Sequence, residues 1–308
     1  MYISTHTRAI SLAQVEPTMT YCVAARVDEG LVFLADTRVT AGFDQVNTFR
    51  KLHVFERAGD RAMVLLVAGN LGLCQAILNI LATESADDPN SIWAVSRMFD
   101  VAHRVGQAVR LVFDDFAPTL RAQGLAFNVD LILGGQIAGG ECSLFQIYPA
   151  GNFVEAMPDS PYVEIGASKQ ATPLLNQLLR HSSPLTHAAK CALLAMDWTL
   201  RTNLSVGMPL DMLVYKAGTL AIDEYVNIES TNHAFEGFRK SWDQELLKAV
   251  DQVSNPLQWV FHAVCAPDTP AHLPLRIQPA CSKHQRALTA ASPAADNPSF
   301  ARGKGSGS

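Results

Sequence analysis

Short apolar runs separated by glycine-containing turns dominate the first part of the chain. The runs cover residues 21–27, 31–35, 52–55 and 63–68. Gly30 stands in the turn between the first two runs, and Gly59 stands between the last two. Apolar runs of this length joined by a short turn with glycine are typical of β-hairpins. The pattern therefore predicts two hairpins in succession.

The apolar spacing then changes to the three- and four-residue period of amphipathic helices. One such stretch covers residues 73–81, and a longer one covers residues 92–116. We predict that the longer helix begins at residues 90–91 and that Phe99 and Phe116 lie on its buried face.

Strands and helices continue in groups along the rest of the chain. Strands are predicted at residues 129–133, 144–148, 212–215 and 220–222, and a closing helix at residues 235–253. Two further helices are predicted to open at Thr172-Pro173 and at Ser183-Pro184, because a hydroxyl residue followed by proline is favoured at a helix start.

The order of these elements indicates the fold class. Strands come grouped as hairpins and helices come in pairs, whereas βαβ proteins alternate strand and helix one by one. Hairpins form antiparallel sheets, and a helix pair can cover one face of a sheet. We therefore predict an α+β fold, a four-layer αββα sandwich of two mostly antiparallel sheets that face each other.

Composition narrows the class of protein. Of the 308 residues, 48% are apolar and 17% are charged, and the net charge is −5. The apolar runs are far shorter than the about 20 residues of a membrane-spanning helix, and the negative charge argues against a nucleic-acid or anionic-membrane partner. Six cysteines without CxxC spacing or a neighbouring histidine cluster argue against a zinc site and a disulfide framework. We expect a cytoplasmic protein without a metal or cofactor.

Periodicity is absent at both ends of the chain. Residues 1–19 are polar, and residues 255–308 contain seven of the sixteen prolines with many alanines and serines. A segment of the latter composition buries too little apolar surface to offset the entropy of ordering. We predict an N-terminal extension over residues 1–19, one folded domain over residues 20–254 and a disordered tail over residues 255–308, with a short subdomain around residues 257–264 as the alternative.

Thr20 is the first residue of the predicted domain and follows Met19. If the chain were cut or initiated between the two, Thr20 would carry a hydroxyl nucleophile and a free α-amine. The pKa of an α-amino group is about 7.7–8.0, which suits a general base near neutral pH. One residue would then supply both nucleophile and base. A threonine that opens a strand is more often only a good β-former.

Two charged residues strengthen this hypothesis by their joint position. Asp36 ends the run 31–35, and Lys51 stands directly before the run 52–55. In antiparallel strands the start of one strand lies beside the end of its neighbour, so we predict that Thr20, Asp36 and Lys51 meet at one end of the same sheet. The lysine would stabilise the threonine alkoxide, and the aspartate would orient the lysine. Taken singly, Asp36 is more often a turn residue and Lys51 a solvated one.

Gly69 is a fourth candidate. It lies where the run 63–68 passes into the helix predicted to start near Asn70. A glycine at that point lets a substrate approach the backbone, and its N–H near a helix terminus is a possible oxyanion-hole donor. Glycine is also ordinary in structural turns between a strand and a helix.

Several stretches taken together resemble the Anbu class, bacterial relatives of proteasome β-subunits within the N-terminal-nucleophile hydrolases. They are TYCVA from Thr20, LVFLADTR with Asp36, TFRK ending at Lys51, VAGN with Gly69, IGAS with Ser168, and RTNLSVGMPLD. The resemblance implies the N-terminal-nucleophile hydrolase fold with Thr20 as the nucleophile. Asp36 and Lys51 would be the acid and the lysine that tune it, and Gly69 would be the oxyanion-hole glycine.

The resemblance also implies polar partners for the amine of the nucleophile. Ser168 resembles the serine that supports this amine, and one more partner should lie within residues 202–205, where we favour Ser205. From the residues alone, Ser168 can equally be a helix N-cap.

The chain departs from the family pattern, in which a methionine directly before the nucleophile starts the protein. Here 19 residues precede Thr20, and while they are attached its nitrogen is an amide that cannot act as a base. We expect either translation from Met19 with removal of that methionine, or self-processing of a propeptide.

The resemblance implies a threonine peptidase, in which attack by Thr20 on a peptide carbonyl gives an acyl-enzyme that water releases. It also implies a homo-oligomer, a ring or an open spiral, that acts on peptide or protein substrates. Since no P-loop motif GxxxxGK[ST] occurs, an ATPase unfoldase would be a separate chain. The alternatives are an amidase or transferase acting on a small amide, and a non-catalytic assembly scaffold.

Overall fold

The computed structural model describes residues 20–41, 45–222 and 224–253. The predicted extension over residues 1–19 and the predicted tail over residues 255–308 lie outside the described residues, and so does the alternative subdomain within that tail.

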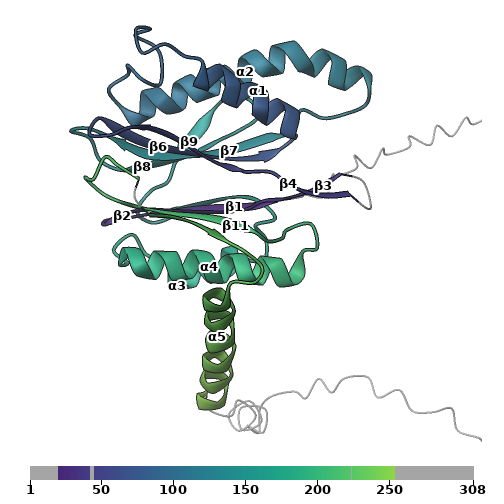
Figure 1. The fold of residues 1–308 in the computed structure, drawn as a ribbon, viewed down its shortest axis with the longest axis vertical. Helices are drawn as coiled ribbons and strands as arrows, with labels where there is room; N and C mark the ends of the chain where they lie inside the picture. The colour runs from purple at the N-terminus through teal and green to yellow at the C-terminus, as the bar shows by residue number, and fades with distance from the viewer. Residues whose placement is uncertain (1–19, 42–44, 223, 254–308) are drawn as a thin grey trace, which may run out of the picture. The chain divides into compact units, whose positions relative to one another are not determined.

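Two five-stranded antiparallel sheets lie face to face in the middle of the fold (Figure 1). The first sheet contains β1 (Tyr21–Val27), β2 (Gly30–Asp36), β10 (Tyr162–Gly166), β11 (Leu210–Lys216) and β12 (Glu224–Ile228), in the order β10-β1-β2-β11-β12. The second contains β5 (Leu52–Arg57), β6 (Arg61–Gly69), β7 (Val129–Ile137), β8 (Ser143–Ile147) and β9 (Phe153–Glu155), in chain order. A short hairpin of β3 (Arg38–Ala41) and β4 (Gln45–Thr48) stands between β2 and β5 along the chain.

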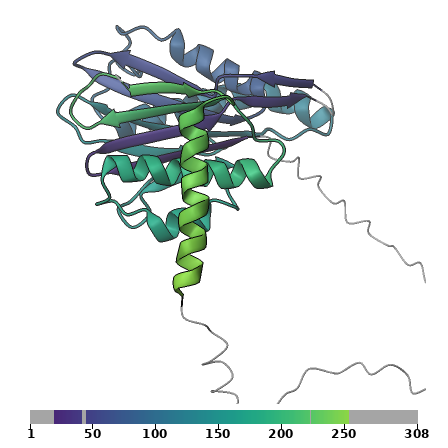
Figure 2. The ribbon, with the colours of Figure 1, turned by 60° about the horizontal axis from the view of Figure 1, so that its bottom comes forward.

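Helices cover the outer faces of both sheets. The described helices are α1 (Leu71–Ala82), α2 (Met98–Ala122), α3 (Thr172–Leu178), α4 (Leu185–Thr202) and α5 (His233–Gln252). The pair α1 and α2 lies on the second sheet and the pair α3 and α4 on the first, an arrangement that the turned view of Figure 2 also shows. The predicted α+β fold with αββα layers is confirmed. None of the described helices has the length and hydropathy to cross a membrane.

The chain divides into two units, residues 1–246 and residues 247–308. All the described strands and the helices α1 to α4 belong to the first unit. The candidate residues Thr20, Asp36 and Lys51 belong to it as well.

Both faces of the strands β1, β2 and β6 are buried, which explains their unbroken apolar runs. Along β1, Tyr21 and Val23 pack in a core shared with α3 and α4, whereas Cys22 packs in the core between the two sheets. A third core joins the second sheet to α1 and α2. A strand with two covered faces needs apolar residues at successive positions instead of at every second one.

The long helix begins later than predicted, at Met98. Distant side chains bind the backbone of the segment before it. Arg61 Nη1 donates to the carbonyl oxygens of Ile92 at 2.7 Å and Val95 at 3.0 Å, and Glu84 accepts the N–H of Ile92 at 2.7 Å. Because these contacts satisfy the backbone groups, the segment is stable as a series of turns.

Two further predictions were wrong, and four strands were not predicted. Phe99 and Phe116 are 52% and 46% exposed, although the helical stripe predicted that both are buried. Residues 220–222 form no strand, because Leu220 has a left-handed φ of 48°, and the last strand among the described residues is β12. The strands β3, β4, β9 and β10 had no predicted counterpart, because each has at most five residues and none contains a long apolar run.

Gly106 allows α2 to approach the turn between β8 and β9. A Cβ atom on Gly106 would lie 2.2 Å from the carbonyl oxygen of Gly151. Arg110 Nη1 donates to that same oxygen at 2.9 Å, which holds the turn against the helix. Since the clash would involve backbone atoms, no side-chain rotation relieves it.

We predict that Gly106→Ala lowers the free energy of unfolding by about 1–3 kcal/mol, as overpacking of a core does. The matched control is Gly72→Ala in the exposed first turn of α1, where the nearest atom to the new Cβ lies 3.4 Å away and alanine favours the helix. Urea unfolding followed by circular dichroism measures both variants. A Gly106→Ala variant as stable as the wild type would contradict the close packing of α2 against the turn between β8 and β9.

Candidate active site

Thr20 immediately precedes β1 and is 6% exposed. Its carbonyl oxygen accepts the N–H of Ala167 at 2.8 Å. Gly166, at the end of β10, has a φ of 84°, and a Cβ there would lie 2.1 Å from the same oxygen. Only glycine therefore allows β10 to lie so close to the start of β1. This contact holds the backbone of Thr20 in place.

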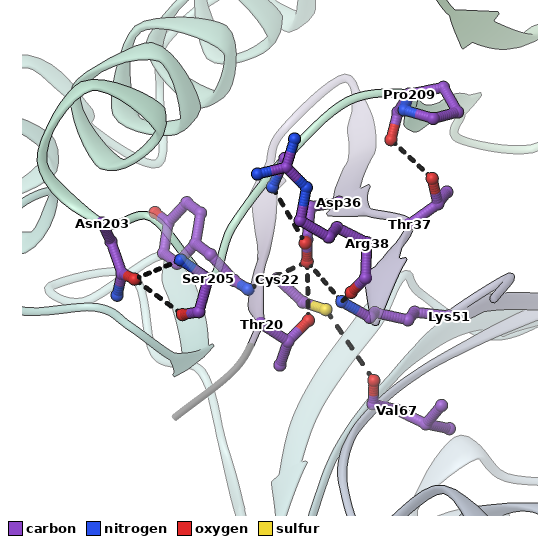
Figure 3. A network of polar contacts seen from close by, with 12 residues as sticks. Thr20, Cys22, Asp36, Thr37, Arg38, Lys51, Val67, Asn203, Ser205 and Pro209 are labelled. Carbon is purple, nitrogen blue, oxygen red and sulfur yellow. Dashed lines mark hydrogen bonds and ion pairs between the residues drawn. The ribbon is translucent and has the colours of Figure 1, made fainter. Parts of the chain in front are cut away.

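Asp36 is the last residue of β2 and is completely buried. Its Oδ1 accepts three hydrogen bonds, from the hydroxyl of Thr20 at 2.6 Å, the N–H of Tyr21 at 3.0 Å and the ammonium of Lys51 at 2.6 Å. Its Oδ2 accepts the N–H of Gly207 at 3.3 Å. A buried carboxylate is unfavourable unless it is paired and hydrogen-bonded. Four donors from three segments of the chain meet this requirement (Figure 3).

Lys51 reaches Asp36 from the other sheet. It stands directly before β5, its side chain is 6% exposed, and its carbonyl oxygen accepts the N–H of Val67 within the hairpin β5–β6. The prediction that Thr20, Asp36 and Lys51 meet is confirmed. The prediction that they meet within one sheet was wrong, because Thr20 and Asp36 belong to the first sheet and Lys51 to the second. The two hairpins pack face to face instead of edge to edge, because each contributes an apolar face to the core between the sheets.

The arrangement places a positive charge beside the hydroxyl of Thr20. An ammonium next to a hydroxyl stabilises the alkoxide, and a carboxylate bonded to the ammonium keeps it charged and oriented. Cys22 does not offer a thiolate here, because burial raises the pKa of its thiol to about 12. Within the described part of the chain, no group of three or more histidines, cysteines or acidic residues is placed to hold a metal ion.

Gly69 ends β6 in a left-handed conformation with a φ of 105°. A Cβ there would lie 2.4 Å from the carbonyl oxygen of Asn128, so the chain requires glycine for structural reasons alone. The next residue, Asn70, caps α1 by accepting two N–H groups of its first turn at 3.0 and 3.3 Å. Gly69 thus lies at a helix N-terminus, and its role as an oxyanion donor stays a prediction.

Ser168 follows Ala167, whose N–H donates to the carbonyl oxygen of Thr20. The N–H of Ser168 donates to the carbonyl oxygen of Gly166 at 2.9 Å, and its carbonyl oxygen accepts the N–H of Ala171 at 3.0 Å. The N-cap of α3 is Ala171, so Ser168 is not the helix cap. The backbone of Ser168 is thus tied to the segment that holds Thr20, while the role of its hydroxyl stays a prediction.

The connection between α4 and β11 contains the stretch in which a polar partner was predicted. Asn203 Oδ1 accepts both the N–H of Ser205 at 3.0 Å and its hydroxyl at 2.6 Å. The sequence did not predict that Gly207 donates to Asp36, although both belong to motifs quoted above. Both motifs are visible in the sequence, but neither indicates that two residues 171 positions apart form a hydrogen bond.

A half-buried carboxylate, Glu164 of β10, lies beside the start of β1. It accepts the hydroxyls of Tyr21 at 2.5 Å and Thr172 at 2.7 Å. Burial raises the pKa of Glu164 above its ordinary value, and the two hydroxyl donors oppose this shift. Burial also raises the pKa of Tyr21, so its hydroxyl remains a donor. These contacts tie β1, β10 and α3 together directly beside Thr20.

Comparisons with known proteins place this architecture among proteasome subunits. The model of the family described as proteasome subunit matches residues 18–214. Similar solved structures include Anbu (ancestral beta-subunit) from Yersinia bercovieri, with 40% identity and a TM-score of 0.71, an Anbu (Gly-1) mutant from Hyphomicrobium sp. strain MC1, with 38% and 0.71, and the helical assembly of the Anbu complex from Pseudomonas aeruginosa, with 38% and 0.72. Each covers 77% of this chain and 98% of the other. A comparison with the curated proteins finds no match.

We predict that Lys51→Met lowers the free energy of unfolding by about 3–5 kcal/mol, because it leaves a buried carboxylate without its cation. Adding Asp36→Asn to the same chain should recover most of this loss, since the remaining group is neutral and still accepts the hydroxyl of Thr20. Urea unfolding of the wild type, the two single variants and the double variant measures the coupling. If the losses in free energy of unfolding of the two single variants simply add in the double variant, Lys51 and Asp36 do not stabilise each other as a buried pair.

Glu164 makes stability depend on pH. Since its pKa is raised above 4.5 in the folded chain, its contribution to stability is fully present below pH 4.5 and is lost as the pH rises through the folded pKa. Glu164→Gln cannot ionise, so the stability of the wild type relative to this variant should fall between pH 4.5 and neutral pH. Urea unfolding across this range measures the difference, and a constant difference would exclude the proposed linkage.

Proposed function

Because this chain belongs to the proteasome-subunit family and, within it, to the Anbu class, we propose that it is an N-terminal threonine peptidase with Thr20 as the nucleophile. One observation carries the proposal: the hydroxyl of Thr20 and the ammonium of Lys51 both bind Oδ1 of Asp36 at 2.6 Å. A nucleophile, a cation and an orienting carboxylate thus form one buried cluster, as an activated hydroxyl requires.

The free amine of Thr20 acts as the general base in this proposal. With a pKa of about 7.7–8.0, an α-amine is partly unprotonated near neutral pH. It accepts the hydroxyl proton while Oγ attacks the carbonyl carbon of a peptide bond, and Lys51 stabilises the negative charge that develops on Oγ. We assign the N–H of Gly69 to the oxyanion of the tetrahedral intermediate.

Collapse of the intermediate breaks the C–N bond of the substrate. The leaving amine takes the proton from the α-ammonium of Thr20, and the acyl group remains on Oγ as an ester. Water then gives a proton to the same amine, attacks the ester and releases a carboxylic acid with the hydroxyl regenerated. We propose that Ser168 and Ser205 hold the amine during both steps.

The mechanism requires Thr20 to be the N-terminal residue. We propose that initiation at Met19 and removal of that methionine expose it, with self-processing of residues 1–19 as the alternative. Intact-mass measurement of protein made from the native locus distinguishes the two when the initiation codon at Met1 is also mutated. A protein that retains residues 1–19 contradicts both routes.

The assembly is part of the proposal. The Pseudomonas aeruginosa relative is described as a helical assembly of the Anbu complex. We propose that copies of this chain likewise associate, in a ring or an open spiral, and act on peptide or protein substrates in the cytoplasm. An ATPase unfoldase, where one delivers substrate, would be a separate chain.

We predict that a peptide epoxyketone, an electrophile directed at N-terminal threonine, forms one adduct per chain on protein that begins at Thr20. Mass-spectrometric peptide mapping should place the adduct on Thr20. Thr20→Ala should abolish both the adduct and peptide cleavage, and Thr20→Ser should retain them in part. Thr83→Ala, which removes an exposed hydroxyl at the end of α1, is the control and should match the wild type.

The outcomes separate the alternative functions. No adduct on protein confirmed to begin at Thr20 would contradict a peptidase and favour a non-catalytic scaffold. An adduct together with cleavage of small amides, but not of an unfolded protein, would indicate an amidase.

A further inference from the structure

Arg38 lies at the site, but the mechanism above does not use its side chain. It is the first residue of β3, and its carbonyl oxygen accepts a hydrogen bond from Lys51 at 2.8 Å. Figure 3 shows Arg38 beside Asp36. Its guanidinium is directed to the connection between α4 and β11, where Nη1 donates to the carbonyl oxygen of Leu204 at 3.2 Å. One residue therefore contacts the lysine through its main chain and this connection through its side chain.

The guanidinium lies against the backbone of Gly207. A Cβ atom on Gly207 would lie 2.1 Å from both Cζ and Nε of Arg38. The N–H of Gly207 donates to Oδ2 of Asp36 at 3.3 Å. Arg38 thus packs on the residue whose amide binds the central carboxylate.

The connection between α4 and β11 is held from two sides. Val206 is buried in the core shared by the first sheet and α4. Leu204 is 94% exposed, and its carbonyl is held by Arg38. Between these two residues stands Ser205, whose N–H and hydroxyl both bind Asn203. On the exposed side of this connection, the guanidinium of Arg38 contacts both Leu204 and Gly207.

The Nε atom of Arg38 is buried without a hydrogen-bond partner. Burying such a donor without a partner is unfavourable, so hydrogen bonding of the guanidinium does not by itself explain its place. An unsatisfied buried group calls for another explanation, and contact with a functional site is one.

We propose that Arg38 is a positioning residue for the nucleophile, a role that rests on the function proposed above. Its guanidinium holds residues 204–207 against the site, which keeps the amide of Gly207 on Asp36 and keeps Ser205 in its place. The flat guanidinium covers Gly207 and reaches the carbonyl of Leu204 at the same time, whereas the compact ammonium of a lysine does not provide this geometry.

The test uses the chain that begins at Thr20 and the variants Arg38→Met, Arg38→Lys, Gly207→Ala and the double variant Arg38→Met/Gly207→Ala. Gly207→Ala keeps the arginine, but its Cβ displaces the guanidinium, which is the flexible end of a long side chain. Labelling with the peptide epoxyketone gives the maximal rate constant of adduct formation and the probe concentration that gives half of it. Circular dichroism measures the folded fraction of each variant.

We expect Arg38→Met and Gly207→Ala each to lower the maximal rate constant by about tenfold or more, because misplacing reacting groups is costly. The half-saturating concentration should not change, since the change affects the nucleophile and not the surface that binds the probe. Arg38→Lys should not restore the rate. The double variant should be no slower than the slower single variant, because both changes remove the same contact.

Arg97→Met is the matched control, because it removes an exposed arginine before α2 that pairs with Asp100. It should react like the wild type. A folded Arg38→Met variant that also reacts like the wild type would overturn the positioning role and leave the role of Thr20 intact. If the losses in rate constant of the two single variants add in the double variant, Arg38 has a structural role only. The same holds if the loss in rate constant of a variant matches its unfolded fraction. If the wild type itself does not react, the proposed function fails and the positioning role fails with it.

Discussion

The buried carboxylate of Asp36 is the interaction on which the rest of this structure depends. A charged carboxylate in the interior is tolerated only when donors surround it. Here the donors come from the start of β1, from Lys51 before β5 and from Gly207 before β11. One of these segments belongs to the first sheet, one to the second, and one is the connection between α4 and β11. The charge of Asp36 is therefore compensated only when both sheets and this connection are packed together. The contacts that stabilise this charge therefore also assemble the candidate site.

Close approach of backbones is the second constraint around the site. Gly166 and Gly69 combine a left-handed backbone with a neighbouring carbonyl that a Cβ would strike, and Gly207 leaves room for the guanidinium of Arg38. In each case a side chain would push apart two segments that meet beside Thr20 or at the start of α1. Glycine thus brings main-chain groups, which have little freedom to move, to the site.

The fold class could be predicted because each layer leaves a local pattern. Sheets covered on both faces produce apolar runs, and helices on the outside produce stripes with a period of three to four residues. The errors have a different origin. Before Met98 the carbonyl of Ile92 binds Arg61, and the chain forms turns where the stripe predicted a helix. Arg61 lies on another element, so the pattern of the segment itself carries no sign of this contact.

By itself, the sequence determined that Thr20 stands directly before one strand, that Asp36 closes the next and that Lys51 precedes another, because strand ends coincide with the ends of local apolar runs. Only the tertiary structure decided that Lys51 comes from the opposite sheet and that Arg38 and Gly207 contact the same cluster. Asp36 and Gly207 are 171 positions apart and still share a hydrogen bond. Such a contact depends on how the layers pack, to within a fraction of an ångström, and a local pattern of apolar and polar residues does not contain that information.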